Sequence, residues 1–156
     1  MAKDETDNIA LASAYRLLAV GYRQSAETLN TTIETRSDGS PARLTAIPIY
    51  FLISHSAELL LKSALLKRGY AEGDLKKFDY RHNLNSLLAA LQKKGVSVTP
   101  ETIFLINGLH SQHQSHALRY SVLTDNGQKT FWPPLPLLFA MLDELLMLTR
   151  ISTQGI

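Results

Sequence analysis

The chain has 156 residues, of which 45% are hydrophobic and 19% are charged, and this composition fits one globular domain with a sizeable core. The absence of cysteine excludes disulfide frameworks, thiolate zinc sites and cysteine nucleophiles. A net charge of +2 gives no argument from bulk charge for nucleic-acid binding.

The N-terminal segment does not have the pattern of an export signal. Asp4, Glu5 and Asp7 precede any apolar run, whereas a secretory signal begins with positive charge. No uninterrupted apolar run in the chain approaches the length that spans a membrane. We therefore expect a soluble cytoplasmic protein that does not associate with a membrane.

Two long amphipathic helices are predicted in the first half of the chain. Over Ile9–Thr35 the apolar residues recur at spacings of three, four and seven, as on one helical face, at Leu11, Tyr15, Leu18, Tyr22 and Leu29. A second helix is predicted to begin at Ser40 and Pro41, because serine followed by proline is typical of a capped helix start. Its Pro48 should kink or restart it, and it should end near Gly69.

Two shorter helices are predicted after an aperiodic connection at 70–81. Asn83 can cap a helix whose leucines follow the helical spacing until Gly95 ends it. Thr99 and Pro100 repeat the signal of a cap followed by proline, and the helix that they open should extend to about residue 117.

A last helix is predicted where the leucines of residues 138–146 resume the helical spacing. The preceding segment 131–136, which contains Phe131 and Trp132, is too apolar for a freely solvated loop and should cover the core or a dimer surface. We therefore predict an all-α antiparallel helical bundle of about five helices, in a single domain over residues 8–152.

His55, Glu58 and Lys62 form the first polar group that could carry chemistry. At 100° per residue the three side chains fall in one narrow sector of the second helix, beside the apolar Phe51 and Leu65. Glu58 should therefore be partly buried and should need a partner, which Lys62 can supply from one turn later. The group can be a site of acid, base and cation, or an interhelix polar lock that fixes register, and the lock is the commoner arrangement in bundles.

A second group consists of His110, His113 and His116, which follow one another at intervals of three residues. Two neighbours could share a metal ion with His55 or Glu58 from a facing helix. Because the intervening residues are polar and a metal site needs an ordered outer shell, we favour a solvated or substrate-facing row of histidines. We expect no metal and no cofactor.

The stretch from residue 67 to residue 94 is locally basic. Phosphate backbones could bind there, and three aromatic side chains are available for stacking, but interleaved acidic residues favour a solvated loop. The basic residues are Lys67, Arg68, Lys76, Lys77, Arg81, Lys93 and Lys94.

Three segments follow one another in a distinctive order: "FLISHSAELLLKSALLKRGY", then "RHNLNSLLAAL", then a helix that ends in "HALRY". Over residues 10–150 this order resembles the HEPN-like helical bundles of prokaryotes. The usual aspartate of the second motif is Asn83 here, which still suits a helix cap. The resemblance implies functional positions at Glu58, Lys62, His82, Leu84, Arg119 and Tyr120.

The members of this family divide into ribonucleases of toxin, antiphage or RNA-processing systems and noncatalytic modules. The ribonucleases use an arginine followed after four to six residues by a histidine, a spacing that no histidine of this chain satisfies. The resemblance therefore implies a noncatalytic module that binds RNA, a nucleotide or a partner protein, as a homodimer. The alternative is a metal-independent endoribonuclease of a toxin–antitoxin or defence system, in which Arg119 holds phosphate while His82 or His116 moves protons. A histidine-ligated metalloprotein is a third possibility.

Overall fold

The computed structural model of the protein describes residues 2–39, 46–114 and 133–150, and these residues contain helices but no strand. The prediction of an all-α fold is confirmed. The helices are α1 (Ala2–Asn30), α2 (Ile47–Leu66), α3 (Glu72–Leu75), α4 (Leu84–Lys93), α5 (Pro100–Gln114) and α7 (Leu135–Leu148).

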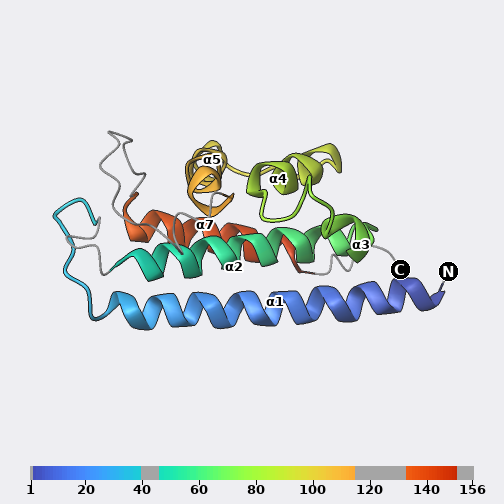
Figure 1. Ribbon diagram of the computed structural model, residues 1–156, viewed down its shortest axis with the longest axis horizontal. Helices are drawn as coiled ribbons and strands as arrows, with labels where there is room; N and C mark the ends of the chain where they lie inside the picture. The colour runs from blue at the N-terminus through green and yellow to red at the C-terminus, as the bar shows by residue number, and fades with distance from the viewer. Residues whose placement is uncertain (1, 40–45, 115–132, 151–156) are drawn as a thin grey trace.

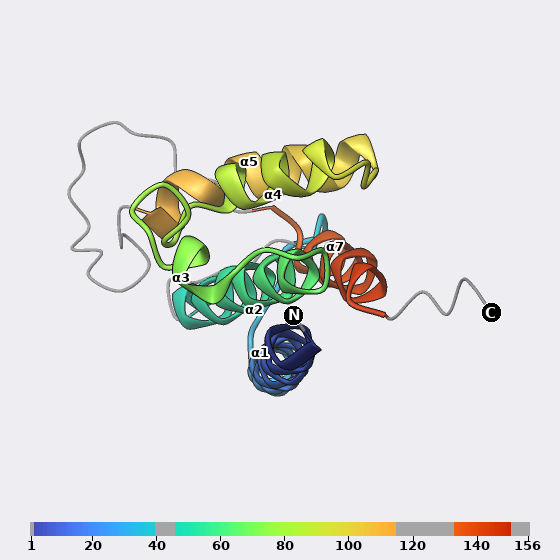
Figure 2. The ribbon, with the colours of Figure 1, turned by 90° about the vertical axis from the view of Figure 1, so that its right-hand side faces the viewer.

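The helices are arranged in three layers. Figure 1 shows α1 along one side, α2 antiparallel to it with α7 alongside, and α4 and α5 on the far side of α2. Figure 2, turned by 90°, shows that α4 and α5 lie side by side and run across α2 rather than along it. The helix α2 is therefore the central element, and it is covered from both sides.

Small side chains determine how α1 packs on α2. Ala12, Ala19 and Ala26 are spaced by seven residues and are fully buried, which lets the two helices approach closely. On the facing helix the Ser56 hydroxyl donates to the Ala19 carbonyl at 2.8 Å, and the Ser63 hydroxyl donates to the Ala12 carbonyl at 2.7 Å. We call this contact the alanine seam.

The predicted apolar face of the first helix is only partly right. Leu11, Tyr15 and Tyr22 pack against the core as expected. Leu18 and Leu29 are exposed, because the alanines rather than the leucines occupy the positions that face α2. A leucine stripe is therefore a misleading guide to a helix that packs closely through alanine.

Pro48 does not kink α2, because the helix begins at Ile47. It stands in the first turn of α2, where its missing N–H leaves no helical hydrogen bond unmade. The expected cap at Ser40 and Pro41 lies outside the described residues. The helix ends one turn before Gly69, whose φ of +86° places it in the left-handed region that glycine adopts without strain.

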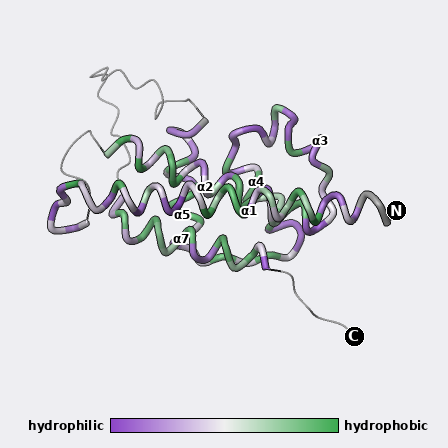
Figure 3. The backbone as a smooth tube through the Cα atoms, turned by 90° about the horizontal axis from the view of Figure 1, so that it is seen from below, coloured by the Kyte–Doolittle hydropathy of each residue, from purple (hydrophilic) through white to green (hydrophobic). Residues whose placement is uncertain are grey.

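The helix α2 is long and apolar enough to cross a membrane, by length and composition alone. Most of it is buried inside the bundle, and a central core helix passes the same test. Figure 3 shows hydrophobic positions recurring along α2 and α7, whereas the connection around α3 is largely hydrophilic. This property of α2 is therefore weak evidence for a membrane.

Side-chain caps fix the starts of α4 and α5 as predicted. The Asn83 Oδ1 accepts from the Ser86 N–H at 3.0 Å, and the Thr99 Oγ1 accepts from the Thr102 N–H at 3.2 Å. The Glu144 carboxylate of α7 also accepts from the Thr99 N–H, at 2.7 Å, so that α7 holds the start of α5 in place.

The segment that enters α7 covers the core, as far as the structure describes it. Pro133 and Leu135 are buried, and the Tyr50 hydroxyl donates to the Pro133 carbonyl at 2.7 Å. The segment is predicted to cover the core or a dimer surface, and these two residues cover the core. Phe131 and Trp132 lie outside the described residues.

Candidate functional site

Glu58 is the centre of a polar cluster. Its partners come from α2, from α5 and from His82, the residue before the Asn83 cap of α4. The Glu58 side chain is only 2% exposed. One carboxylate oxygen, Oε1, accepts from the Lys62 ammonium at 2.6 Å. The other, Oε2, lies 2.6 Å from the His113 Nε2 and 3.1 Å from the His82 Nδ1. A carboxylate buried to this degree requires such partners.

Each partner reaches Glu58 from a different part of the chain. Lys62 is one turn further along α2, and His113 projects from α5. His82 immediately precedes the Asn83 cap and has a φ of +56°, a left-handed conformation that is uncommon for a residue with a side chain. Strained backbone of this kind persists where surrounding contacts hold it, and here the cap and the Glu58 carboxylate hold His82 from two sides.

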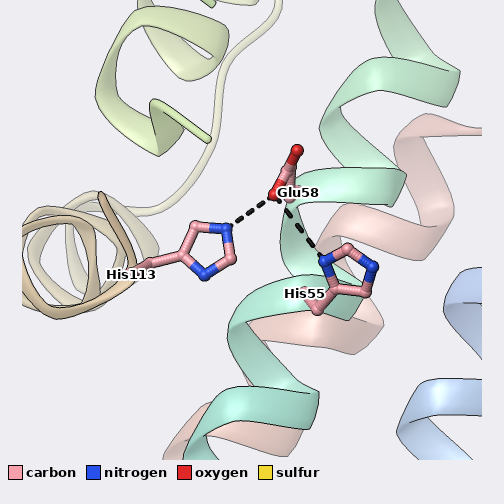
Figure 4. Close-up of side chains that lie close together, drawn as sticks. All are labelled: His55, Glu58 and His113. Carbon is pink, nitrogen blue, oxygen red and sulfur yellow. Dashed lines mark hydrogen bonds and ion pairs between the residues drawn. The ribbon is translucent and has the colours of Figure 1, made fainter. Parts of the chain in front are cut away.

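His55 completes the cluster one turn before Glu58. Its Nδ1 lies 3.7 Å from the Glu58 Oε2, which is too far for a hydrogen bond but close enough for attraction to the carboxylate. The imidazole stacks on Phe51 with ring centroids 5.9 Å apart and meets the edge of Tyr22 at 4.6 Å. In Figure 4 the Glu58 carboxylate lies between His55 from its own helix and His113 from α5.

The protonation of the cluster follows from its geometry. Burial by itself would raise the pKa of Glu58, but the hydrogen bond with His113 and the nearby Lys62 ammonium together lower that pKa well below its ordinary value. The carboxylate is therefore ionised and can only accept hydrogen bonds. His113 must then donate from Nε2 and His82 from Nδ1.

The structure brings together most of the predicted site residues that it describes. His55, Glu58 and Lys62 share one face of α2 as predicted, and Glu58 is buried with Lys62 as its partner. His82, which the family resemblance singled out, joins them. Arg119, Tyr120 and His116 lie outside the described residues. Sequence reasoning missed Tyr22, whose only signal was its place on the apolar face of α1.

The predicted row of solvated histidines is wrong for His113. That residue is 4% exposed and is hydrogen-bonded to Glu58, because α5 crosses α2 at this point. His110 lies one turn earlier and makes no described contact with Glu58; burial lowers its pKa, and the nearby His113 adds to that effect. The histidines therefore do not act as a row, since only His113 reaches the cluster among the described ones.

Most basic residues of the stretch 67–94 form contacts that stabilise the fold. The Lys67 ammonium donates to the Thr149 carbonyl and the Arg68 guanidinium to the Leu148 carbonyl, so that both residues hold the C-terminal end of α7. Two further cations pair with acidic residues in and around α3, which is a helical turn inside the predicted irregular connection. The remaining exposed basic residues of the stretch are Arg81, Lys93 and Lys94.

Two kinds of ligand suit the cluster chemically. The side chains of Lys62, His55 and His82 are 12%, 21% and 24% exposed, whereas the side chain of Glu58 is 2% exposed. An anion could bind at this edge. On the buried side, His55, Glu58 and His113 present three donor atoms that lie within 4.8 Å of one another, a set that could hold a metal ion.

No protein-family model, curated protein or solved structure gives a significant match to the chain. The HEPN-like interpretation therefore depends on the motif residues themselves. Of these, Glu58, Lys62 and His82 lie in one cluster.

Proposed function

We propose that the protein is a noncatalytic HEPN-like module that binds RNA through a phosphate at the solvent-facing edge of the Glu58 cluster. The observation that carries the proposal is the distribution of charge. One buried carboxylate is surrounded by one ammonium and three imidazoles, and the partly exposed members of the cluster are Lys62, His55 and His82.

The negative charge of Glu58 is already neutralised by the Lys62 ammonium, 2.6 Å away, and therefore does not repel a phosphate at this edge. A phosphate beside His55 and His82 would accept hydrogen bonds from their imidazole N–H groups, and such bonds are charge-assisted because the acceptor is an anion. The exposed Arg81 guanidinium precedes His82 in the chain and supplies a further cation close by.

The same contacts argue against catalysis. His113 is buried and donates to Glu58, so it is held away from any substrate bound at the edge. Lys62 is likewise engaged with the carboxylate. With these groups committed to one another, the cluster holds its own geometry rather than presenting a mobile acid and base.

A metal-independent ribonuclease remains the second candidate, and one contact favours it. A carboxylate that accepts from the Nδ1–H of a histidine orients the ring, as in sites where histidine acts as a general base. Glu58 and His82 form such a pair at 3.1 Å, and His82 is the most exposed of the three clustered histidines. In the ribonuclease mechanism, His82 would take the proton from a ribose hydroxyl.

One assay tests both candidates. Fluorescence anisotropy with a labelled single-stranded RNA should show binding that weakens as salt is raised. His82→Asn should reduce the affinity by about tenfold, because asparagine tolerates the left-handed backbone but cannot become cationic. The matched control is Lys93→Ala, which removes an exposed cation at the far end of α4, about 15 Å away, and should have a smaller effect.

The integrity of the RNA after the assay separates the two candidates. Intact RNA supports the binding module, whereas cleavage that His82→Asn abolishes supports the ribonuclease. Absent or salt-insensitive binding, together with intact RNA, would remove both.

We also propose that the protein forms a homodimer through the outer face of α1. Leu17 and Leu18 are 68% and 54% exposed, and the small residues Ala14 and Gly21 are exposed in the same sector of the helix. Light scattering at high micromolar concentration should give twice the chain mass. Leu18→Glu should give a monomer with an unchanged circular dichroism spectrum, and a monomeric parent protein would contradict the proposal.

A further inference from the structure

We propose that His55, Glu58 and His113 bind a divalent transition-metal ion, with Zn²⁺ as the best fit to two imidazole nitrogens and one carboxylate oxygen. The proposal goes beyond RNA binding and does not depend on it. It also departs from the expectation of a metal-free protein, because the sequence could not show that α5 brings His113 to the face of α2 that carries Glu58.

The donor atoms lie close enough together for small side-chain movements to bring them onto one metal ion. His55 Nδ1, Glu58 Oε2 and His113 Nε2 all lie within 4.8 Å of one another. The carboxylate oxygen is 2.6 Å from the His113 nitrogen and 3.7 Å from the His55 nitrogen. Ligands of a tetrahedral zinc ion lie roughly 3.3 Å apart, since each zinc–ligand bond is about 2.0–2.1 Å long, and the two measured distances bracket that value.

The His55 nitrogen is the feature that points to a ligand rather than to a polar lock. Its Nδ1 is buried and has no hydrogen-bond partner among the described residues, which is a costly arrangement for a ring nitrogen. Phe51 and Tyr22 contact the ring and hold it so that Nδ1 faces the carboxylate. A metal ion at this point would satisfy the nitrogen lone pair.

The surroundings supply an outer shell. Lys62 donates to Oε1, which fixes the carboxylate and leaves Oε2 toward the two histidines. The ammonium also opposes a second positive charge, so the affinity should be lower than that of a site with two carboxylates. His82 Nδ1, 3.1 Å from Oε2, holds the carboxylate from outside this set of three donors. A metal ion would displace the protons that His113 and His82 now share with the carboxylate.

Titration of the protein without a histidine tag tests the site. After treatment with a chelator, Zn²⁺ added in a calorimeter should bind at one ion per chain and should raise the melting temperature. Co²⁺ should give visible absorption bands, which Zn²⁺ then abolishes. A parent protein that binds neither ion overturns the proposal.

The variants separate this site from adventitious binding. His55→Phe keeps an aromatic ring between Phe51 and Tyr22 but removes the nitrogen, and it should weaken Zn²⁺ binding by at least about 100-fold. His110→Ala, on α5 outside the cluster, should leave binding unchanged. Binding that survives His55→Phe, or that depends on His110, overturns the proposal. Because all of these measurements are made without RNA, their failure would leave the RNA proposal intact.

Discussion

The two faces of α2 are stabilised in different ways. Toward α1, the alanine seam brings two helices close together, and its polar contacts are hydroxyl groups that donate to carbonyls already inside a helix. Toward α4 and α5, the contact is built around the buried Glu58 carboxylate, which is bonded to Lys62 and His113. The face toward α1 is stabilised by the close packing of small side chains, and the face toward α4 and α5 by the charged cluster.

This difference predicts how each face responds to mutation. A seam of small residues is sensitive to added volume, because closely packed helices have no room to accommodate it. A buried ion cluster is sensitive to the loss of one member, because the remaining charges are left without partners in a medium of low dielectric constant. Four measurements test this contrast, and their expected effects on stability decrease from the first to the last.

The largest effect is expected for Glu58→Ala. Removal of the carboxylate leaves the Lys62 ammonium and two imidazole N–H groups without their acceptor, and should lower the free energy of unfolding by about 3–5 kcal/mol. Urea denaturation followed by circular dichroism measures the change. The control is Glu27→Ala, which removes an exposed carboxylate that is also paired one turn away, with Arg23, and should cost about 0.5 kcal/mol or less. Equal costs for the two variants would mean that the cluster does not stabilise the fold.

The second effect is a dependence on pH that Glu58 creates. The pKa of Glu58 in the folded state lies below its ordinary value of 4.5, so below about pH 4.5 the unfolded chain binds more protons than the folded one. The stabilisation from Glu58 is therefore complete above pH 4.5 and is lost progressively as the pH falls further. Between pH 4.5 and pH 3 the stability of the parent should fall more steeply than that of Glu58→Gln, by up to about 1.4 kcal/mol per pH unit. Parallel pH profiles would contradict this assignment.

The third effect belongs to the alanine seam. Ala19→Leu inserts three carbon atoms where the helix backbones are close, and should cost about 1–3 kcal/mol. Ala89→Leu makes the same change at an exposed position of α4 and should leave the stability within about 0.5 kcal/mol of the parent. If both variants unfolded at the same urea concentration, the close approach of α1 and α2 would be disproved.

The smallest effect is expected for Ser56→Ala. The hydroxyl that donates to the Ala19 carbonyl is lost, but alanine fits the space and no charge is stranded, so the cost should be about 1 kcal/mol. Ser13→Ala, at an exposed position of α1, is the control and should have less effect. A cost for Ser56→Ala that approached the cost for Glu58→Ala would remove the contrast between the two faces.

Local signals in the sequence account for the longer helices and for three of the five residues of the cluster. Asn83 and Thr99 cap the helices that they were expected to cap, because capping depends on neighbours three residues away. His55, Glu58 and Lys62 share a face because helical periodicity fixes their directions. The buried seam of alanines escaped prediction, since the hydrophobic pattern gives more weight to Leu18 than to Ala19, although only Ala19 is buried.

What the sequence determined by itself was therefore the all-α class, the starts of the capped helices and the polar face of α2. Only the tertiary structure decided that α5 crosses α2, that His113 is buried on Glu58 while His110 is not, and that His82 completes the cluster. The physical reason is the separation in sequence over which each kind of interaction acts. Periodicity and capping act within one or two helical turns, whereas the partner of a buried carboxylate is decided by how helices distant in sequence pack, and in this protein His113 lies 55 residues from Glu58.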